Sequence, residues 1–318
     1  MSAKNRQPAL GFTIVELIIA LLLGVVILTA AVSFLITHLR TLEGSDIRES
    51  VDRNARYIGV LLRRDIQAAG IDIESTTHFG TVAVWPGSNG DTLMMLYVPY
   101  VPNPTPIHDI DTAIVTQPPP GDGTCTPLDR CLSVLKVDTA TFDLSDRHLA
   151  RLQVAGTRRL VIVESFAVSG CCSVDVTFTG ADTLFHQPAG LADLQVELNG
   201  TYIQKLTPLI YYVDDQERLI RAQRLNLDGT PDGDIVAYGV ETFELMLVFA
   251  DGDVLEEANA YDMDDSNDYD DIVAVRVRVT VKADRADPRV NDGKLLRRTV
   301  EWQVSPRNLR YEKNRLNN

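Results

Sequence analysis

The stretch from Gly11 to Ile36 reads GFTIVELIIALLLGVVILTAAVSFLI, and it decides how the rest of the chain must be built. From Leu17 onward this stretch carries no charge, and only Thr29 and Ser33 are appreciably polar. At about 1.5 Å of rise per residue, a helix of this length spans roughly 30 Å, the hydrocarbon thickness of a bilayer. The sequence therefore predicts a membrane-spanning helix near the N-terminus.

A cleaved secretory signal peptide is an alternative explanation of such a segment. Signal peptides have a basic region, about 7–15 apolar residues and then a cleavage site of small residues. Lys4 and Arg6 supply the basic region, but the apolar run is longer, and no Ala-x-Ala site follows it. An anchor is the better interpretation, with Lys4 and Arg6 in the cytoplasm and the bulk of the chain outside.

Glu16 is the acid that interrupts the start of the apolar run. A carboxylate near the bilayer centre costs at least about 2.5–3.5 kcal/mol on insertion scales, and less near the interface. Glu16 either stays hydrated close to the headgroups or awaits a cation inside a protein assembly. The physics of the segment leaves both interpretations open.

The run Gly11-Phe12-Thr13-Ile14-Val15-Glu16-Leu17 resembles the class III signal of type IV pilins and type II secretion pseudopilins. The resemblance implies that residues 1–11 are a leader, that prepilin peptidase cuts between Gly11 and Phe12, and that Phe12 is N-methylated. It also implies that Glu16 meets the new α-amine of a neighbouring subunit. Losing one partner of a buried pair typically costs about 3–5 kcal/mol, so this pair would penalise wrong register in a filament.

The helix is expected to continue beyond the transmembrane half (residues 12–36) through an amphipathic half (residues 37–70). Apolar residues recur there at intervals of three and four, which is one stripe of an α-helix. Gly44 is an expected weak point, and Gly70 is a natural end of the helix. The stripe consists of Ile47, Val51, Ala55, Ile58, Leu62, Ile66 and Ala69.

Beyond Gly70 the chain turns into short β-rich runs separated by Gly, Pro, Asn and Asp. In the run 271–282, valines alternate with other residues from Val273 to Val281, which predicts a half-buried strand. The Pro- and Gly-rich span from Val101 to Pro127 predicts a long loop or a boundary between two lobes. Strands are expected at 81–85, 92–101, 132–137, 159–168, 173–179, 200–213, 218–225, 234–250, 271–282 and 295–304.

These segments together predict an α+β protein. A long N-terminal helix, first transmembrane and then amphipathic, would pack on a large antiparallel β-rich domain over residues 71–318.

A second resemblance covers pieces along nearly the whole chain. Segments resembling PilW-type minor pilins of type IV pili are Arg53–Tyr57, Leu62–Gly70, Gly90–Leu93, Tyr238–Leu245, Ile272–Val281 and Arg297–Leu309. The resemblance implies a non-catalytic minor pilin that primes pilus assembly, supports twitching motility and ends at the pilus tip, where adhesion is a possible added role. Its implied partners are other minor pilins and the major pilin, and its implied locations are the inner membrane and then the pilus on the cell surface. The J-type pseudopilin of type II secretion is the related alternative.

The cysteines are Cys125, Cys131, Cys171 and Cys172. An exported domain reaches an oxidising compartment, where structural disulfides are expected. Four cysteines allow three pairings, and the sequence does not choose among them. A zinc site is the alternative, but no C-x2-C pair supports it.

Acidic residues dominate the chain, whose formal net charge is −14. This balance argues against a nucleic-acid-binding surface. Carboxylates are densest from Asp251 to Asp271, where they predict either a solvated loop or an irregular Ca²⁺ site formed by Asp262, Asp264 and Asp268. An EF-hand is excluded, because Asn267 and Val273 stand where its Gly and Glu are needed.

Catalysis finds little support in the sequence. The histidines at 38, 78, 108, 148 and 186 fall in no metal-ligand spacing, and there is no HExxH, G-x-S-x-G or Walker-type loop. A membrane-tethered exoenzyme is the alternative from a different class, and no cofactor other than the possible Ca²⁺ is expected.

Overall fold

The computed structural model describes residues 13–307 apart from 72, 74, 99–106, 113–129, 136–147, 155–156, 170–172, 181–201, 227–228, 261, 263 and 289. The chain divides into two compact units. One unit joins the residues up to Ser50 with Ala283–Leu296, and the other joins Val51–Lys282 with the residues from Arg297 onward. The expected leader and Phe12 lie outside the described residues.

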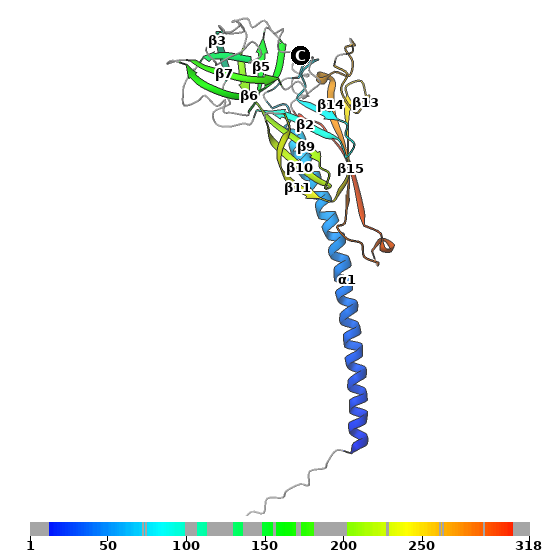
Figure 1. The fold of residues 1–318 in the computed structure, drawn as a ribbon. Helices are drawn as coiled ribbons and strands as arrows, with labels where there is room; N and C mark the ends of the chain where they lie inside the picture. Colours follow the sequence, from blue (N-terminus) through cyan, green and yellow to red (C-terminus); the bar gives the residue numbers. More distant parts are fainter. Residues whose placement is uncertain are drawn as a thin grey trace, which may run out of the picture. The chain divides into compact units, whose positions relative to one another are not determined.

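A single helix, α1 (Ile14–Ala68), runs through the N-terminal part of the chain (Figure 1). Its bounds confirm the expected helix. Gly44, expected as a weak point, lies inside uninterrupted helix, where a Cβ atom would come within 3.2 Å of Val290. The helix ends before Gly70, whose φ of 77° is in the left-handed region that favours glycine.

The apolar stripe on the second half of α1 is buried, as its spacing predicts. Its seven members, from Ile47 to Ala69, are at most 5% exposed. Tyr57 and Val60, on the other side of the same helix, are exposed. The periodicity therefore separates a core face from a solvent face.

A five-stranded antiparallel sheet provides one layer of the core. Leu93 to Leu96 in its second strand are all buried, so this strand is covered on both faces. In spatial order the strands are β1 (Val82–Trp85), β2 (Thr92–Tyr97), β9 (Thr207–Val213), β10 (Arg218–Leu225) and β11 (Pro231–Tyr238).

A four-stranded antiparallel sheet carries the valine strand. Val275, Val277, Val279 and Val281 are fully buried, which confirms the alternation. Val273 is an exception, because the strand pairing skips it and Ala274 is buried instead. In spatial order the strands are β13 (Val254–Leu255), β12 (Val240–Phe249), β14 (Ile272–Lys282) and β15 (Arg297–Val304), and the short helices η2 (Tyr269–Asp271) and η3 (Asn291–Gly293) precede the last two.

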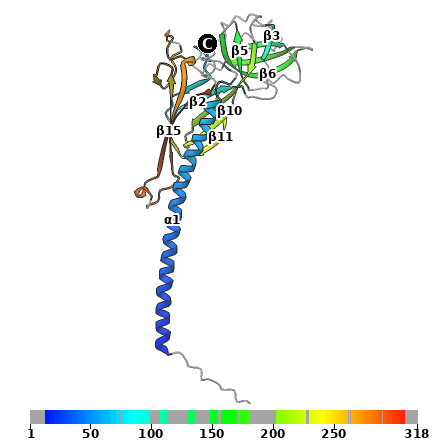
Figure 2. The same ribbon diagram turned by 180° about the vertical axis from the view of Figure 1, so that it is seen from behind.

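A closed antiparallel barrel is inserted between β2 and β9, which are neighbours in the five-stranded sheet. Part of the expected loop from Val101 to Pro127 forms one of its strands. A second strand, His148–Val154, was not expected from the sequence. In spatial order the barrel consists of β3 (Ile107–Thr112), β4 (Arg130–Leu135), β7 (Ser173–Gly180), β6 (Thr157–Ser169), β5 (His148–Val154) and β8 (Tyr202–Lys205). Figure 2 labels β3, β5 and β6 of this barrel.

Two expected strands are each divided between different sheets. The expected run 200–213 breaks at Leu206, whose N–H donates to the carbonyl of Leu149. The expected run 234–250 breaks at Gly239, which has a φ of 68°. A Cβ atom at Gly239 would lie 2.6 Å from the carbonyl oxygen of Lys282, so this corner has no room for a side chain.

Candidate functional site

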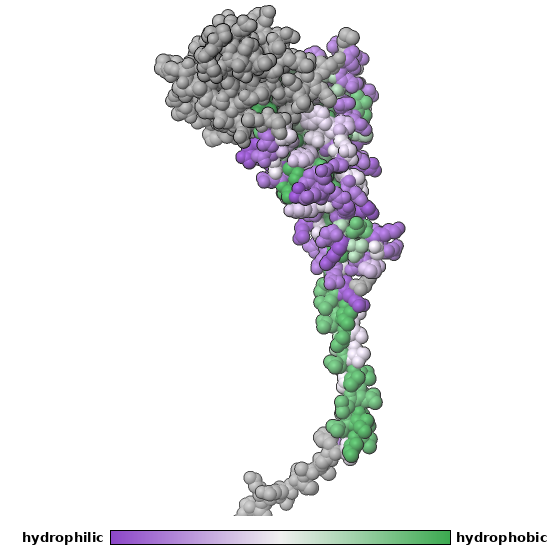
Figure 3. Space-filling view, viewed as in Figure 1, coloured by the Kyte–Doolittle hydropathy of each residue, from purple (hydrophilic) through white to green (hydrophobic). Residues whose placement is uncertain are grey.

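The N-terminal half of α1 is an exposed apolar surface. Every large apolar side chain from Ile14 to Leu42 is at least 40% exposed. Figure 3 shows this part of the helix in the colour of hydrophobic residues. The helix is long and apolar enough to cross a membrane. A surface of this kind requires lipid or other apolar helices around it.

The hydroxyl groups within this apolar half are satisfied inside the helix. Thr29 Oγ1 donates to the carbonyl of Val25 at 2.8 Å, and Thr37 Oγ1 donates to the carbonyl of Ser33 at 2.9 Å. Bonds back to the preceding turn of this kind remove the need for water. These threonines are therefore compatible with a membrane or a packed helix bundle.

Thr13 and Glu16 form a capping box at the start of α1. The N–H of Glu16 donates to Thr13 Oγ1 at 3.2 Å, and the N–H of Thr13 donates to Glu16 Oε2 at 3.3 Å. The first backbone donors of a helix have no partner within the helix, and this reciprocal pair satisfies two of them. Glu16 therefore has a structural task within its own chain as well as the assembly role that the resemblance implies.

A shallow apolar groove crosses the same half of the helix at Gly24. Its volume is about 380 Å³, and its walls include Leu21 and Leu28. A Cβ atom built on Gly24 would meet nothing within 4 Å. Small residues at such positions let the side chains of a second helix approach closely.

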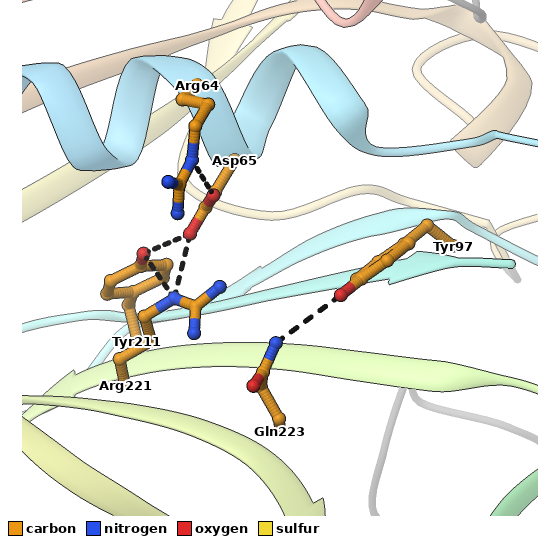
Figure 4. A network of polar contacts seen from close by, with 6 residues as sticks. All are labelled: Arg64, Asp65, Tyr97, Tyr211, Arg221 and Gln223. Carbon is orange, nitrogen blue, oxygen red and sulfur yellow. Dashed lines mark hydrogen bonds and ion pairs between the residues drawn. The ribbon is translucent and has the colours of Figure 1, made fainter. Parts of the chain in front are cut away.

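A buried polar cluster ties the second half of α1 to the five-stranded sheet (Figure 4). Asp65 Oδ2 accepts a hydrogen bond from the Tyr211 hydroxyl at 2.5 Å and one from Arg221 Nε at 2.8 Å. Arg221 Nε also lies 3.0 Å from the Tyr211 hydroxyl. The second carboxylate oxygen of Asp65 pairs with the exposed Arg64.

Burial makes this cluster sensitive to the loss of Asp65, Tyr211 or Arg221. Asp65 is 5% exposed and Tyr211 is fully buried. Burial, together with the hydrogen bond to Asp65, raises the pKa of the Tyr211 hydroxyl far above its ordinary range, so this group remains a donor. The cluster therefore fixes the angle and register of the helix on strands β9 and β10.

The acidic side chains around a cleft of about 490 Å³ serve the fold. The cleft lies beside the turns Gly87–Asp91 and Asp214–Glu217. Asp214 pairs with Arg218, Glu217 with Lys282 and Glu241 with Arg297, while Asp91 accepts the N–H of Leu245. Each of these four carboxylates has a partner on a strand or a turn, so we assign them a structural role.

The cysteine prediction falls mostly outside the described residues. Cys131 belongs to strand β4, but its side chain is not described, and Cys125, Cys171 and Cys172 lie outside the described residues. The disulfides stay a prediction.

The three candidate calcium ligands do not form a described metal site. The N–H of Asp264 donates to Asp262 Oδ1 at 2.9 Å, whereas Asp268 is buried. In the part of the chain that the structure describes, no three His, Cys, Asp or Glu side chains are arranged to hold a metal ion. The calcium site stays a prediction without structural support.

Asp268 is instead a buried carboxylate at the end of the acidic segment. Burial, with the nearby carboxylates of Asp270 and Asp271, raises the pKa of Asp268 to about 6. Its Oδ1 atom accepts no hydrogen bond within the described chain. The neighbouring Tyr269 is also buried, and its ring leaves no room for a Cβ atom at Gly80. This end of the segment is therefore packed rather than solvated.

Sequence reasoning singled out Glu16 but missed Thr13 and the Asp65 cluster. The Thr-x-x-Glu spacing from Thr13 to Glu16 is a visible capping signal. An acid at position 65, next to the buried stripe residue Ile66, is also visible. The sequence does not show that Tyr211 and Arg221 are the partners of Asp65, because both lie on strands far away in the sequence.

Comparison with known proteins finds a distant likeness among solved structures. No protein-family model and no curated protein matches the chain. Among solved structures, a type IV-like pilin from Thermus thermophilus is similar over 80% of this chain and 97% of its own, with 10% sequence identity and a TM-score of 0.34. The α+β fold class rests on the long helix and antiparallel sheets of this chain itself.

Proposed function

We propose that this protein is a pilin-type filament subunit. The observation that carries the proposal is the exposed apolar half of α1, which continues into a half whose stripe is buried in a β-rich domain. One helix thus offers a surface suited to lipid before assembly and to neighbouring helices after it. In a pilin, the same helical segment must lie in lipid before assembly and among neighbouring helices after it.

The first step of the proposed pathway is insertion into the inner membrane. Lys4 and Arg6 hold the N-terminus in the cytoplasm, and the bulk of the chain is exported. Prepilin peptidase then cuts between Gly11 and Phe12 and leaves an α-amine on Phe12, which is methylated. Cutting removes the leader's positive charges, which would otherwise resist entry into an apolar filament core.

We assign to Glu16 the role of setting the axial register between neighbouring subunits in the filament. The α-amine of a neighbouring subunit is the cation that its carboxylate would meet. Apolar helix surfaces pack equally well in many registers, so a charge pair in a low-dielectric setting discriminates among them. The cap bonds between Glu16 and Thr13 hold the carboxylate at the first turn of the helix, where the amine arrives.

The finer proposal is a PilW-type minor pilin that primes type IV pilus assembly with other minor pilins and the major pilin. The β domain with its inserted barrel is bulky for a crowded filament wall, which favours the pilus tip. A J-type pseudopilin of type II secretion is the alternative. Neighbouring genes for other minor pilins would support the first assignment, and neighbouring genes for secretion pseudopilins would support the second. A label on the β domain that is found uniformly along the shaft would contradict the location at the tip.

The test uses two substitutions of Glu16 that separate its two tasks. Glu16→Gln keeps a side-chain oxygen for the N–H of Thr13 but removes the charge, and Glu16→Ala removes both. We expect both variants to insert in the membrane and to be cut, and both to be absent from sheared filaments. Normal incorporation of Glu16→Gln would refute the charge pairing, and filaments that never contain the unmodified protein would refute the filament role.

A further inference from the structure

The outer face of the second half of α1 carries a row of arginines around two exposed apolar side chains. Positions three, four and seven apart share one face of a helix. No acidic residue lies between the first and last arginine of this row. The row, called the arginine stripe below, consists of Arg53, Arg56, Tyr57, Val60, Arg63 and Arg64.

Apart from Arg64, which pairs with Asp65, the arginine stripe makes no ion pair within the described fold. Tyr57 is 51% exposed and Val60 is 71% exposed. Arg53, Arg56 and Arg63 are exposed, and none of them is in an ion pair with a described residue. Exposed apolar side chains bordered by unpaired charges are typical of a docking surface with a polar rim.

A groove extends the stripe sideways onto the five-stranded sheet. Its volume is about 530 Å³, and its α1 wall is Tyr57, Leu61 and Arg64. Its wall on β10 and β11 is mixed, because it includes Arg224, which pairs with Asp232, as well as Asp234 and Val236. Strand β11 is the edge of its sheet, so one side of its backbone has no strand partner within the described fold. The groove adds depth to a surface that would otherwise be a convex helix.

The opposite charge is concentrated in another part of the same chain. The acidic segment, residues 251–271, contains ten Asp and Glu residues and no Lys, Arg or His. Glu256, Asp264 and Asp265 are exposed and pair with no described cation. Within one copy, no ion pair of the described residues joins the acidic segment to the arginine stripe.

We propose that the arginine stripe of one copy docks on the acidic segment of a second copy. Opposite charges bring the two surfaces together and orient them, and Tyr57 and Val60 supply the apolar centre that is removed from water. The contact uses two different surfaces, so it is head-to-tail and leaves one stripe and one acidic segment free at the ends. Such heterologous contacts do not close into a dimer, so they can link successive copies at one end of a filament.

Two other occupants of the stripe are disfavoured by charge and distance. About 17 helical residues separate Ile36 from Arg53, which is roughly 25 Å and well beyond a Debye length of about 8 Å from lipid headgroups. Nucleic acid is disfavoured by the net charge of −14. A second copy is the occupant whose complementary charge is present in the chain itself.

The proposal rests on the proposed role as a filament subunit, and it is tested with the full chain in detergent micelles, with Glu16 intact. Sedimentation would measure self-association of four proteins. These are the unmodified chain, a stripe variant (Arg56→Glu with Arg63→Glu), a segment variant (Asp264→Lys with Asp265→Lys) and a control (Arg285→Glu with Lys294→Glu). The control pair is exposed, outside both surfaces, and changes the net charge as much as the stripe variant does.

We expect the unmodified chain and the control to self-associate, and each reversed variant alone to lose at least about tenfold in association constant. Mixing the stripe variant with the segment variant should restore association, because every contact between them again joins opposite charges. Raising the salt should weaken association of the unmodified chain.

Three results would overturn the head-to-tail contact. The first is that the unmodified chain stays monomeric at all concentrations. The second is that neither the stripe variant nor the segment variant changes the association constant. The third is that the stripe variant loses association while the segment variant does not. None of them concerns Glu16, so they are distinguishable from failure of the filament role, which is read from sheared filaments.

Discussion

The carboxylate of Asp65 on helix α1 lies 2.8 Å from the guanidinium Nε of Arg221 on strand β10. Between them they enclose the hydroxyl of Tyr211, so three segments of the chain meet at one polar point. Apolar contacts alone would let the helix slide along the sheet, because its stripe repeats every turn. A hydrogen-bonded charge pair has one geometry, and it therefore selects one register.

Loss of the Asp65 carboxylate should be strongly destabilising. Asp65→Ala leaves a largely buried Arg221 and a buried Tyr211 hydroxyl without their acceptor, so we expect a loss of about 3 kcal/mol in the free energy of unfolding. Urea denaturation of the detergent-solubilised chain would measure it. Arg64→Ala is the control, since the exposed side of the cluster should be worth less than about 1 kcal/mol. Equal losses in the two variants would contradict the assigned role of burial.

The contribution of Asp268 to stability should fall as the pH rises through the range in which this carboxyl ionises. Its pKa is raised from 3.8 to about 6 in the folded chain. The folded state therefore binds a proton that the unfolded state has lost, and this contribution is present below pH 4 and gone above about pH 6. Asp268→Asn should flatten that dependence and increase stability at pH 7 by about 1–2 kcal/mol.

Thermal melts at several pH values would measure the effect of Asp268→Asn. Asp265→Asn is the matched control, because this carboxylate is exposed in the same segment. If both variants kept the dependence of the unmodified chain between pH 4 and 6, the burial of Asp268 would not be its cause.

Removing the Thr13 hydroxyl should loosen the first turn of α1. Thr13→Ala removes the acceptor for the N–H of Glu16, and losing such a cap costs about 1 kcal/mol. Amide hydrogen exchange in micelles should show faster exchange at Glu16 and its neighbours but not in the amphipathic half. Thr13→Ser keeps the hydroxyl and should exchange as the unmodified chain does. Identical exchange in all three proteins would refute the capping box.

The corner at Gly239 should tolerate no side chain. Gly239→Ala combines a φ of 68° with a Cβ placed 2.6 Å from the Lys282 carbonyl oxygen. Gly293→Ala is the matched control, because its φ of 76° is close to that of Gly239 while the nearest atom to the new Cβ, Pro288 Cα, lies at an ordinary 3.6 Å. We expect about 1 kcal/mol of backbone strain in the control and at least about 2 kcal/mol more for Gly239→Ala. Denaturation midpoints that agree would show that the close approach is relieved without cost.

Much of the fold could be predicted wherever the pattern is local. The bounds of α1, its buried stripe and the valine face of β14 follow from spacing within one segment. The division of 200–213 at Leu206 and of 234–250 at Gly239 could not be predicted. Both runs are continuous in β-forming residues, and the breaks arise because the two parts of each run pair with strands elsewhere in the chain.

For the candidate site, the sequence by itself determined the apolar run, the position of Glu16 and its capping distance from Thr13. These properties depend on neighbours along the chain and on the length of an α-helix, so they need no partner. Only the tertiary structure decided that Asp65 meets Tyr211 and Arg221, and that the arginine stripe stays exposed while Ile58 and Leu62 are buried. A helix pattern says which residues share a face, whereas burial is set by where the sheets pack.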